Sequence, residues 1–230
     1  MTASRRTVLG LLTLAAAGAT ASGSLGQAAD EWFPLMGDDG KPVANLRLPV
    51  ELTGQVDALP GLLRIGSATP DVTLVEFFDY NCPYCRKAAK DLRALVEADR
   101  DLRIVLVNNA ILSPMSAQAA KVALAVLKLK GTATAAEFNL ALFDEPGKKD
   151  GLKALDVAKR MGVEREQLEQ TADSPLIGQA LVAQMRMAAA LGFAATPSFV
   201  IGGAGVLGYP GPKSLRKIIS AMRSCDQPAC

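Results

Sequence analysis

The 230-residue sequence contains no histidine. Histidine is the base in Ser-His-Asp and Cys-His catalysis and the commonest metal ligand of proteins. Its absence therefore excludes both kinds of catalytic centre and every histidine-based metal site. Proton transfer in this protein must use carboxylates, thiols or water instead.

The sequence also lacks a marked excess of charge of either sign. It has 25 basic and 23 acidic residues, which gives a formal net charge of +2. Cleavage of the N-terminal segment described next would remove two arginines and leave the mature chain neutral. Because nucleic-acid binding depends on positive charge, we expect no nucleic-acid partner.

Residues 1–28 have the pattern of an export signal peptide. A pair of arginines precedes an apolar stretch over residues 8–21, and small residues up to Ala28 follow with the spacing of a cleavage site. The apolar stretch is short for a membrane-spanning helix, although an uncleaved anchor is an alternative. Residues 4–9 resemble the twin-arginine export motif. We therefore expect a periplasmic protein, exported by the twin-arginine route or the general one.

The central feature of the chain is an apolar segment that runs directly into a Cys-x-x-Cys motif. Residues 72–78 are β-branched and aromatic, which is typical of a buried strand, and apolar residues recur at helical spacing after Cys85. The two cysteines therefore lie where a strand gives way to a helix. Pro83 suits the first position of that helix, which makes Cys82 its N-cap.

This position predicts different roles for the two cysteines. A sulfur at the N-cap faces the unpaired N–H groups of the first helical turn and the positive end of the helix dipole, and both favour thiolate over thiol. Cys82 is therefore the expected nucleophile. Cys85 lies one turn deeper, where it can close a disulfide with Cys82 as the resolving partner.

A second pair, Cys225 and Cys230, offers an alternative, because a Cys-x-x-Cys can be half of a structural zinc site. One pair follows a buried strand and the other ends a tail, so we expect no metal site. A purely structural disulfide between Cys82 and Cys85 would close too short a loop to add much stability. Redox chemistry is the better interpretation of that motif. For the tail pair we expect a structural disulfide, with a second redox pair as the alternative.

Two segments carry a family resemblance. Residues 76–85, EFFDYNCPYC, and residues 192–201, GFAATPSFVI, resemble the DsbA-like thiol–disulfide oxidoreductases of the thioredoxin superfamily. The two motifs occur in the family's order with a helix-rich stretch between them, and the resemblance extends from about Leu62 onward. It implies an α/β thioredoxin fold with an inserted helical domain, no cofactor, and a substrate-binding cis-proline loop that Thr196 and Pro197 match.

Three further residues take their expected roles from this resemblance. Glu76 matches a buried acid that assists proton transfer from the deeper cysteine. The family often pairs this acid with a lysine on the next strand, where this sequence has residues 107–109, Val-Asn-Asn; alternatively, the glutamate faces a sheet edge. Pro83 and Tyr84 would tune the redox properties of Cys82. The strongest oxidants of the family have a histidine in place of Tyr84, so a milder oxidant is expected here.

These features divide the chain into six segments. They are the signal peptide over 1–28, an N-terminal extension over 29–61, the first part of the thioredoxin fold over 62–113, the helical insertion over 114–192, the second part of the fold over 193–224, and the tail over 225–230. In the extension, apolar residues alternate over 44–52 and predict an edge strand, because Pro49 removes a ladder donor. No helical period is visible there. Dimeric members of the family usually begin with a helical stalk, so we expect a monomer.

Within the insertion and beyond it, capping signals predict where helices begin and end. The capping-box spacing over 134–137 predicts a helix start at Thr134, and Ser174 with Pro175 predicts another that ends at Gly192. A hairpin is expected over 198–207, followed by a final helix over 212–223.

The sequence thus predicts an exported enzyme that exchanges disulfides with protein substrates through Cys82-Pro83-Tyr84-Cys85. Its expected partners are proteins or peptides with thiols or disulfides, and a membrane redox partner that resets the cysteine pair. Two alternatives stay open. One is a disulfide isomerase or reductase of the same fold, and the other is a carrier that holds Cu(I) between the two thiolates.

Overall fold

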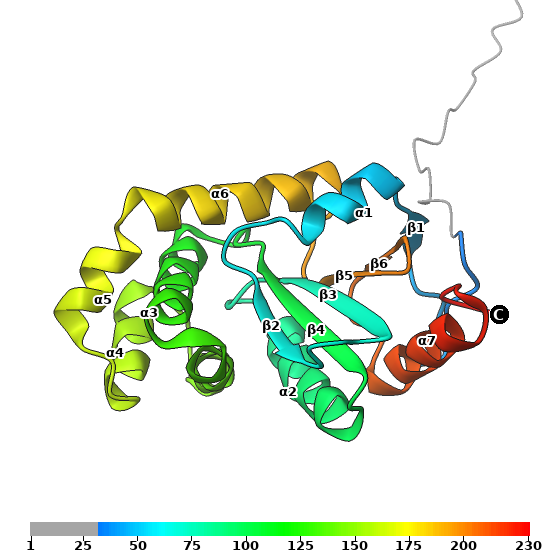
Figure 1. Cartoon of the computed structure of the whole chain (residues 1–230), viewed down its shortest axis with the longest axis horizontal. Helices are drawn as coiled ribbons and strands as arrows, with labels where there is room; N and C mark the ends of the chain where they lie inside the picture. Colours follow the sequence, from blue (N-terminus) through cyan, green and yellow to red (C-terminus); the bar gives the residue numbers. More distant parts are fainter. Residues whose placement is uncertain (1–31) are drawn as a thin grey trace, which may run out of the picture.

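A six-stranded mixed sheet forms the centre of the protein in the computed structural model, which describes residues 32–230 (Figure 1). The predicted signal peptide over 1–28 lies outside these residues. The strand order is β1-β6-β5-β3-β4-β2, and only β3 and β4 run parallel. The strands are β1 (Asn45–Arg47), β2 (Leu63–Gly66), β3 (Val72–Phe78), β4 (Leu102–Asn108), β5 (Ser198–Ile201) and β6 (Ala204–Leu207).

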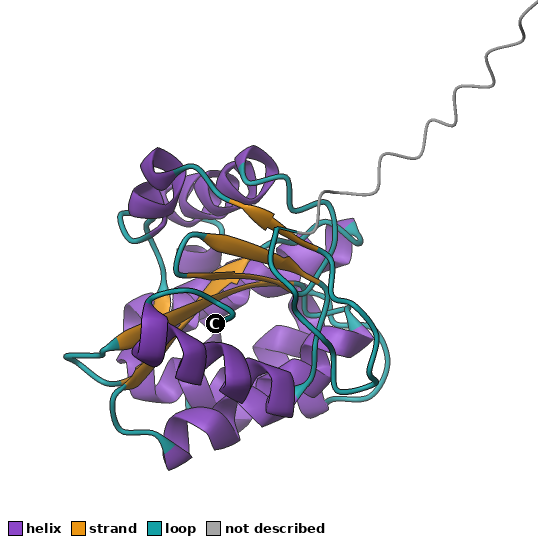
Figure 2. Ribbon diagram, turned by 90° about the vertical axis from the view of Figure 1, so that its right-hand side faces the viewer, coloured by secondary structure: helices purple, strands orange, loops and turns teal. Residues whose placement is uncertain are grey.

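Helices cover both faces of the sheet, which lies between them in Figure 2. They are α1 (Val50–Val56), α2 (Pro83–Ala98), α3 (Pro114–Asp144), α4 (Gly151–Arg160), α5 (Arg165–Ala172), α6 (Pro175–Ala190) and α7 (Pro212–Cys225). Helices α2 and α7 pack on one face, while α1 and α6 lie along the other (Figure 1). Among residues 32–230, no helix is both long and apolar enough to cross a membrane. This arrangement is a thioredoxin fold.

The strand that leads to the cysteines lies inside the sheet. As predicted, β3 spans Val72–Phe78, and it pairs with β4 on one side and β5 on the other. Its side chains alternate between the two apolar clusters: Leu74 and Phe78 pack toward α2, and Val75 and Phe77 toward α6. The strand is thereby fixed on both edges and both faces, so the turn that follows it starts from a rigid point.

The helical insertion separates the two halves of the fold. The chain leaves the sheet at the end of β4 and returns at β5, after helices α3 to α6. The predicted helix start at Thr134 is close to the observed one, because Gly131 has non-helical backbone angles and divides α3 into two helices, the second of which begins just after it. Gly131 has φ 76°, a conformation that residues with a Cβ rarely adopt. The predicted limits of α6 are close to the observed ones.

The N-terminal extension contains both the predicted edge strand and a helix that the sequence pattern missed. Strand β1 pairs with β6 at the edge of the sheet but ends at Arg47. Pro49 is the N-cap of α1, and its carbonyl accepts from the next turn. Val50, predicted to belong to the strand, is 78% exposed, whereas Val56 is buried against the α6 side. The period of two therefore ends at Leu48, and a helical period begins.

The C-terminal tail is closed into a ring by a disulfide between Cys225 and Cys230, whose Cα atoms are 6.3 Å apart. The ring holds Pro228 buried, and Ala229 packs against the main apolar cluster.

We expect the double variant Cys225→Ser/Cys230→Ser to lose roughly 2 kcal/mol of unfolding free energy, because the six-residue loop would no longer be closed in the unfolded chain. Its rate of disulfide exchange should equal that of the wild type. Chemical denaturation without reductant, followed by a peptide-oxidation assay, measures both quantities. A folded double variant without exchange activity would show instead that the tail pair takes part in turnover.

Candidate active site

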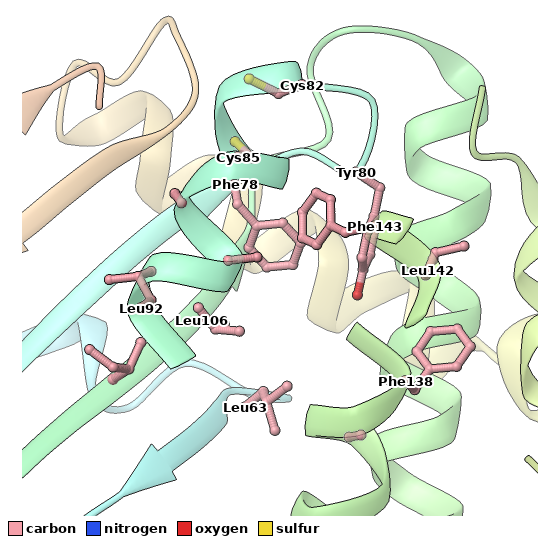
Figure 3. Packing of buried hydrophobic residues seen from close by; sticks show 14 of the residues in the cluster. Leu63, Phe78, Tyr80, Cys82, Cys85, Leu92, Leu106, Phe138, Leu142 and Phe143 are labelled. Carbon is pink, nitrogen blue, oxygen red and sulfur yellow. The ribbon is translucent and has the colours of Figure 1, made fainter. Parts of the chain in front are cut away.

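The two remaining cysteines lie at the turn from β3 into α2. Cys82 is the N-cap of α2 with an extended backbone, and Pro83 occupies the first helical position. Cys85 follows one turn deeper, beneath Cys82 in Figure 3. Both are free thiols, with Cys82 5% exposed and Cys85 fully buried. This placement matches the expected arrangement of an outer and an inner sulfur.

The surroundings of Cys82 stabilise its thiolate and lower its pKa to about 6. The largest contribution is a hydrogen bond from the Cys85 thiol; partial burial opposes it, and the Thr196 side chain and the N–H groups of Cys85 and Tyr84 add to it. The N–H groups at the N-terminus of α2, which the sequence predicts to favour the thiolate, thus lower the pKa of Cys82, but by less than the Cys85 thiol does. In the protonated form, the Cys82 Sγ donates to the Thr196 carbonyl oxygen at 3.1 Å.

The environment of Cys85, in contrast, disfavours its thiolate. Burial raises the pKa of its thiol most, and the hydrogen bond to Cys82 and the nearby Glu76 carboxyl raise it further. A buried thiol that donates to its neighbour is stabilised in the protonated form. The two sulfurs therefore differ strongly in acidity, although they are only three residues apart.

Glu76 lies beneath the cysteines, on the face of β3 that α2 covers. It is 2% exposed, and its Oε1 has no hydrogen-bond partner among the described residues. Its cross-strand neighbours are Leu106 and Phe199 rather than a lysine. Burial, with a smaller contribution from the negative charge of Cys82, raises the pKa of the carboxyl to about 8. The alternative that Glu76 faces a sheet edge is wrong, because β3 has partners on both sides.

The predicted proline loop closes over the outer sulfur. The Thr196-Pro197 peptide is cis, and the Thr196 carbonyl is the acceptor for the Cys82 thiol. The Thr196 hydroxyl has no hydrogen-bond partner among residues 32–230. It is therefore a free donor at the point where a thiolate would form. Residues separated by 114 positions in the chain are brought together here.

Sequence reasoning missed Asn81, which fastens the cysteine turn to the helical insertion. Its side-chain amide donates to the Ser116 hydroxyl at 3.0 Å and to the Lys149 carbonyl at 2.8 Å. Its carbonyl oxygen accepts from the Lys149 N–H at 2.7 Å. The buried Asp79 carboxylate supports the same turn by accepting from the N–H groups of Asn81 and Leu112. Only the polar character of these residues next to an apolar strand hinted at such a role.

An aromatic cluster supports the turn from below (Figure 3). The rings of Phe78 and Tyr80 at the end of β3 both contact Phe143 of α3, with centroid separations of 5.7 and 4.9 Å. The buried Tyr80 hydroxyl accepts from Asn139 at 3.1 Å. The insertion therefore acts as a buttress for the segment that carries the cysteines.

Two hollows adjoin the site. One, of about 510 Å³, lies between Cys82 and the insertion; Arg86, Lys148 and Lys149 line it, and no carboxylate does. The other, of about 460 Å³, extends from Thr196, Pro197 and Tyr84 toward the N-terminal extension. Tyr84 is 64% exposed and contributes to its surface. A bound chain can therefore continue from Cys82 toward either hollow.

The cysteine pairs do not converge on a metal site. Within residues 32–230, no three cysteine, aspartate or glutamate side chains gather in a position to hold an ion. Cys225 and Cys230 are bonded to each other on the far end of α7.

Comparison with known proteins agrees with the thioredoxin fold of the structure. The family model described as Thioredoxin matches residues 59–221. A thioredoxin-like oxidoreductase from Silicibacter pomeroyi DSS-3 is 36% identical, with a TM-score of 0.67, over 72% of this chain and 94% of that chain. No curated protein matches significantly.

Two further solved structures share the fold at lower identity. The thiol-disulfide exchange protein alpha-DsbA2 from Wolbachia pipientis is 23% identical, with a TM-score of 0.68, over 75% of this chain and 94% of that chain. The catalytic domain of Proteus mirabilis ScsC is 24% identical, with a TM-score of 0.67, over 75% of this chain and 97% of that chain.

Proposed function

Since the chain belongs to the thioredoxin family, we propose that it is a DsbA-like enzyme that exchanges disulfides with protein substrates through Cys82 and Cys85. The observation that carries this proposal is the opposite acidity of the two sulfurs. Cys82 has a pKa of about 6, whereas the pKa of Cys85 is raised. Such a pair directs attack to one sulfur and makes the other the internal partner.

The exchange proceeds in two displacements. A substrate thiolate attacks the Sγ of Cys82 in the oxidised enzyme, a mixed disulfide forms, and Cys85 leaves as a thiolate. The second substrate thiolate then attacks the substrate sulfur of the mixed disulfide and releases Cys82 as a thiolate. Two electrons pass from the substrate to the enzyme, and the substrate gains its disulfide. Stabilisation of the Cys82 thiolate makes it a good leaving group in the second step.

Glu76 supplies the proton that Cys85 needs. With a pKa of about 8, its carboxyl is protonated at neutral pH and can transfer a proton to the departing Cys85 thiolate. Thr196 and Pro197 provide the backbone edge for an extended substrate, since the proline has no N–H to compete with substrate groups. Pro83 and Tyr84 tune the Cys82 sulfur through the first turn of α2.

We further propose that the protein works in the periplasm after export, as a monomer, and that a membrane redox partner reoxidises the cysteine pair. The signal-peptide pattern of residues 1–28, with its twin-arginine segment, supports this location. In an oxidising compartment the tail pair would persist as a disulfide.

Binding of Cu(I) between the same sulfurs is less well supported. A two-thiolate site requires both cysteines to be deprotonated, and the raised pKa of Cys85 opposes this. An anaerobic Cu(I) titration beside the exchange assay separates the two functions, because a carrier would bind the ion tightly and turn over substrate slowly.

Trapping of the mixed disulfide tests the proposal directly. The Cys85→Ser variant, incubated with a peptide disulfide, should accumulate the peptide linked to Cys82, since the resolving thiol is missing. Cys82→Ser serves as the matched control and should trap nothing. The oxidised wild type should also convert a two-cysteine peptide to its disulfide. A peptide linked to Cys85, or no oxidation by the wild type, would contradict the mechanism.

We expect Tyr84→His to make the enzyme a stronger oxidant. Tyr84 lies on the first turn of α2, where its N–H adds to the stabilisation of the Cys82 thiolate, and a phenol at this position can give that sulfur at most one neutral hydrogen bond. An imidazolium would stabilise the thiolate and so the reduced form. A gain of about 1.4 kcal/mol corresponds to a potential about 30 mV higher, which equilibration with glutathione can resolve. An unchanged or lower potential would show that another group sets the redox poise.

A further inference from the structure

The N-terminal extension reaches the catalytic site. The groove of about 460 Å³ is lined by Thr196 and Pro197 of the cis loop, by Tyr84 and Lys87 of α2, by residues 207–211, and by residues 37–39 and 41–43 of the extension. Residues 37–43 thus form one wall of the groove. The family model begins only at residue 59, so this wall lies outside the matched part of the chain. The structure thus joins an element outside the family model to the loop that adjoins Cys82.

Hydrogen bonds hold this wall in a fixed position. The Asp38 carboxylate accepts from the Ser214 N–H at 2.7 Å and from its hydroxyl at 2.8 Å, and also from the Lys213 N–H at 3.1 Å. The Asp38 N–H donates to the Pro210 carbonyl at 2.8 Å. Gly211, with φ 98°, lies so close to Asp38 that a Cβ there would collide with the carboxyl group. The turn over residues 37–40 is therefore anchored to the start of α7.

Two charged side chains of the wall remain available for a bound chain. The side chains of Asp39 and Lys41 are 62% and 81% exposed, and their only ion pair among the described residues is with each other, at 3.8 Å. Pairs as exposed as this contribute little to stability. A charged group of a bound polypeptide can therefore displace either partner at small cost.

We propose that residues 37–43 are a substrate-recognition element, which contacts the polypeptide segment next to the cysteine that exchanges with Cys82. This inference rests on the proposed disulfide exchange. The occupant is an extended chain that runs past Thr196 and Pro197 into the groove. Acidic side chains of that segment meet Lys41, and basic ones meet Asp39.

Charge reversal at the wall tests the proposal. The substrates are single-cysteine peptides with a Glu or a Lys two to four residues from the cysteine, in one series on its N-terminal side and in another on its C-terminal side. The oxidised enzyme converts them to disulfide-linked dimers, and chromatography gives the rates. Dithiothreitol, which is too small to reach the wall, reports the chemistry at Cys82 alone.

Lys41→Glu and Asp39→Lys are the test variants. Lys128→Glu, at an exposed position of α3 outside the groove, is the matched control.

In Lys41→Glu, the ratio of the Lys-peptide rate to the Glu-peptide rate should rise about fivefold at low salt in one of the two series, and this gain should vanish at high salt. Asp39→Lys should move the ratio the other way, while Lys128→Glu and all dithiothreitol rates stay unchanged. An unchanged ratio in Lys41→Glu, or an equal shift in Lys128→Glu, would overturn the recognition role. A wild-type enzyme that fails to oxidise dithiothreitol would overturn the proposed exchange itself.

Discussion

A variant that retains only Cys82 of the active pair, Cys85→Ser, should be alkylated by iodoacetamide with a half-maximal rate near pH 6. The serine hydroxyl keeps a donor next to the Cys82 sulfur, so the pKa of about 6 is largely preserved. The reciprocal variant, Cys82→Ser, leaves a fully buried thiol with a raised pKa. At pH 7 it should react at least about a hundred times more slowly, because the thiolate is the nucleophile.

Replacement of Cys85 by alanine tests the cause of this acidity. Alanine removes the largest stabilising contact of the Cys82 thiolate, and a hydrogen bond to a charged group contributes about 1.5 to 3 kcal/mol. The pKa of Cys82 in Cys85→Ala should therefore be at least about one unit higher than in Cys85→Ser. Equal values in the two variants would assign the acidity to the Thr196 side chain and the helix N-terminus. Faster labelling of Cys85 than of Cys82 would reverse the proposed roles.

Replacement of Glu76 by glutamine should change how stability depends on pH. The carboxyl has a pKa of about 8 in the folded, reduced protein, compared with 4.5 when free. Between these pH values the folded state holds a proton that the unfolded state has lost, so the free energy of unfolding falls as pH rises. The full difference is roughly 5 kcal/mol from this group. Glu76→Gln has no such proton and should lack this decline.

Chemical denaturation of the reduced protein at pH 5 and pH 8 measures this effect as a difference between wild type and variant. Glu51→Gln, at an exposed position in the first turn of α1, is the matched control and should follow the wild type. If wild type and Glu76→Gln show the same pH dependence, the carboxyl of Glu76 is not held protonated, and its proposed role as proton donor to Cys85 would fail with it.

Local signals allowed the cysteine turn to be predicted from sequence. The apolar run of β3, the proline after Cys82 and the helical spacing after Cys85 all act within about one helical turn or strand. Each of these signals can therefore be recognised in a short stretch of the sequence. The family resemblance added the cis-proline loop and the buried acid, which lie at matching motif positions but have no local signature of their own.

Features that depend on distant partners were not predicted. The hydrogen bonds of Asn81 reach residues 35 and 68 positions away, and nothing near Asn81 in the sequence indicates them. The contact of Asp38 with α7 spans more than 170 positions. Helix α1 was missed for another reason: apolar residues alternate through Pro49, so the pattern of a strand continued past its physical end.

The helical insertion also determines when the active site can form during folding. The bond from Cys82 to Thr196 spans 114 residues, and the pairing of β3 with β5 spans a similar distance. Closing such a long loop costs conformational entropy before the non-local contacts can stabilise it, so contacts of this kind tend to form late. Until the insertion has packed and β5 has joined the sheet, Cys82 lacks its contact with the Thr196 loop. The hydrogen bonds from Asn81 to Ser116 and Lys149 have not formed either.

An incompletely folded molecule therefore lacks the contribution of the Thr196 side chain, and its Cys82 thiol is less acidic than that of the native protein. Pulse alkylation during refolding should follow this order, with the full acidity of Cys82 appearing only as the last slow phase ends. The distance between the two halves of the site in the chain thus delays the full reactivity of Cys82 until β5 has joined the sheet.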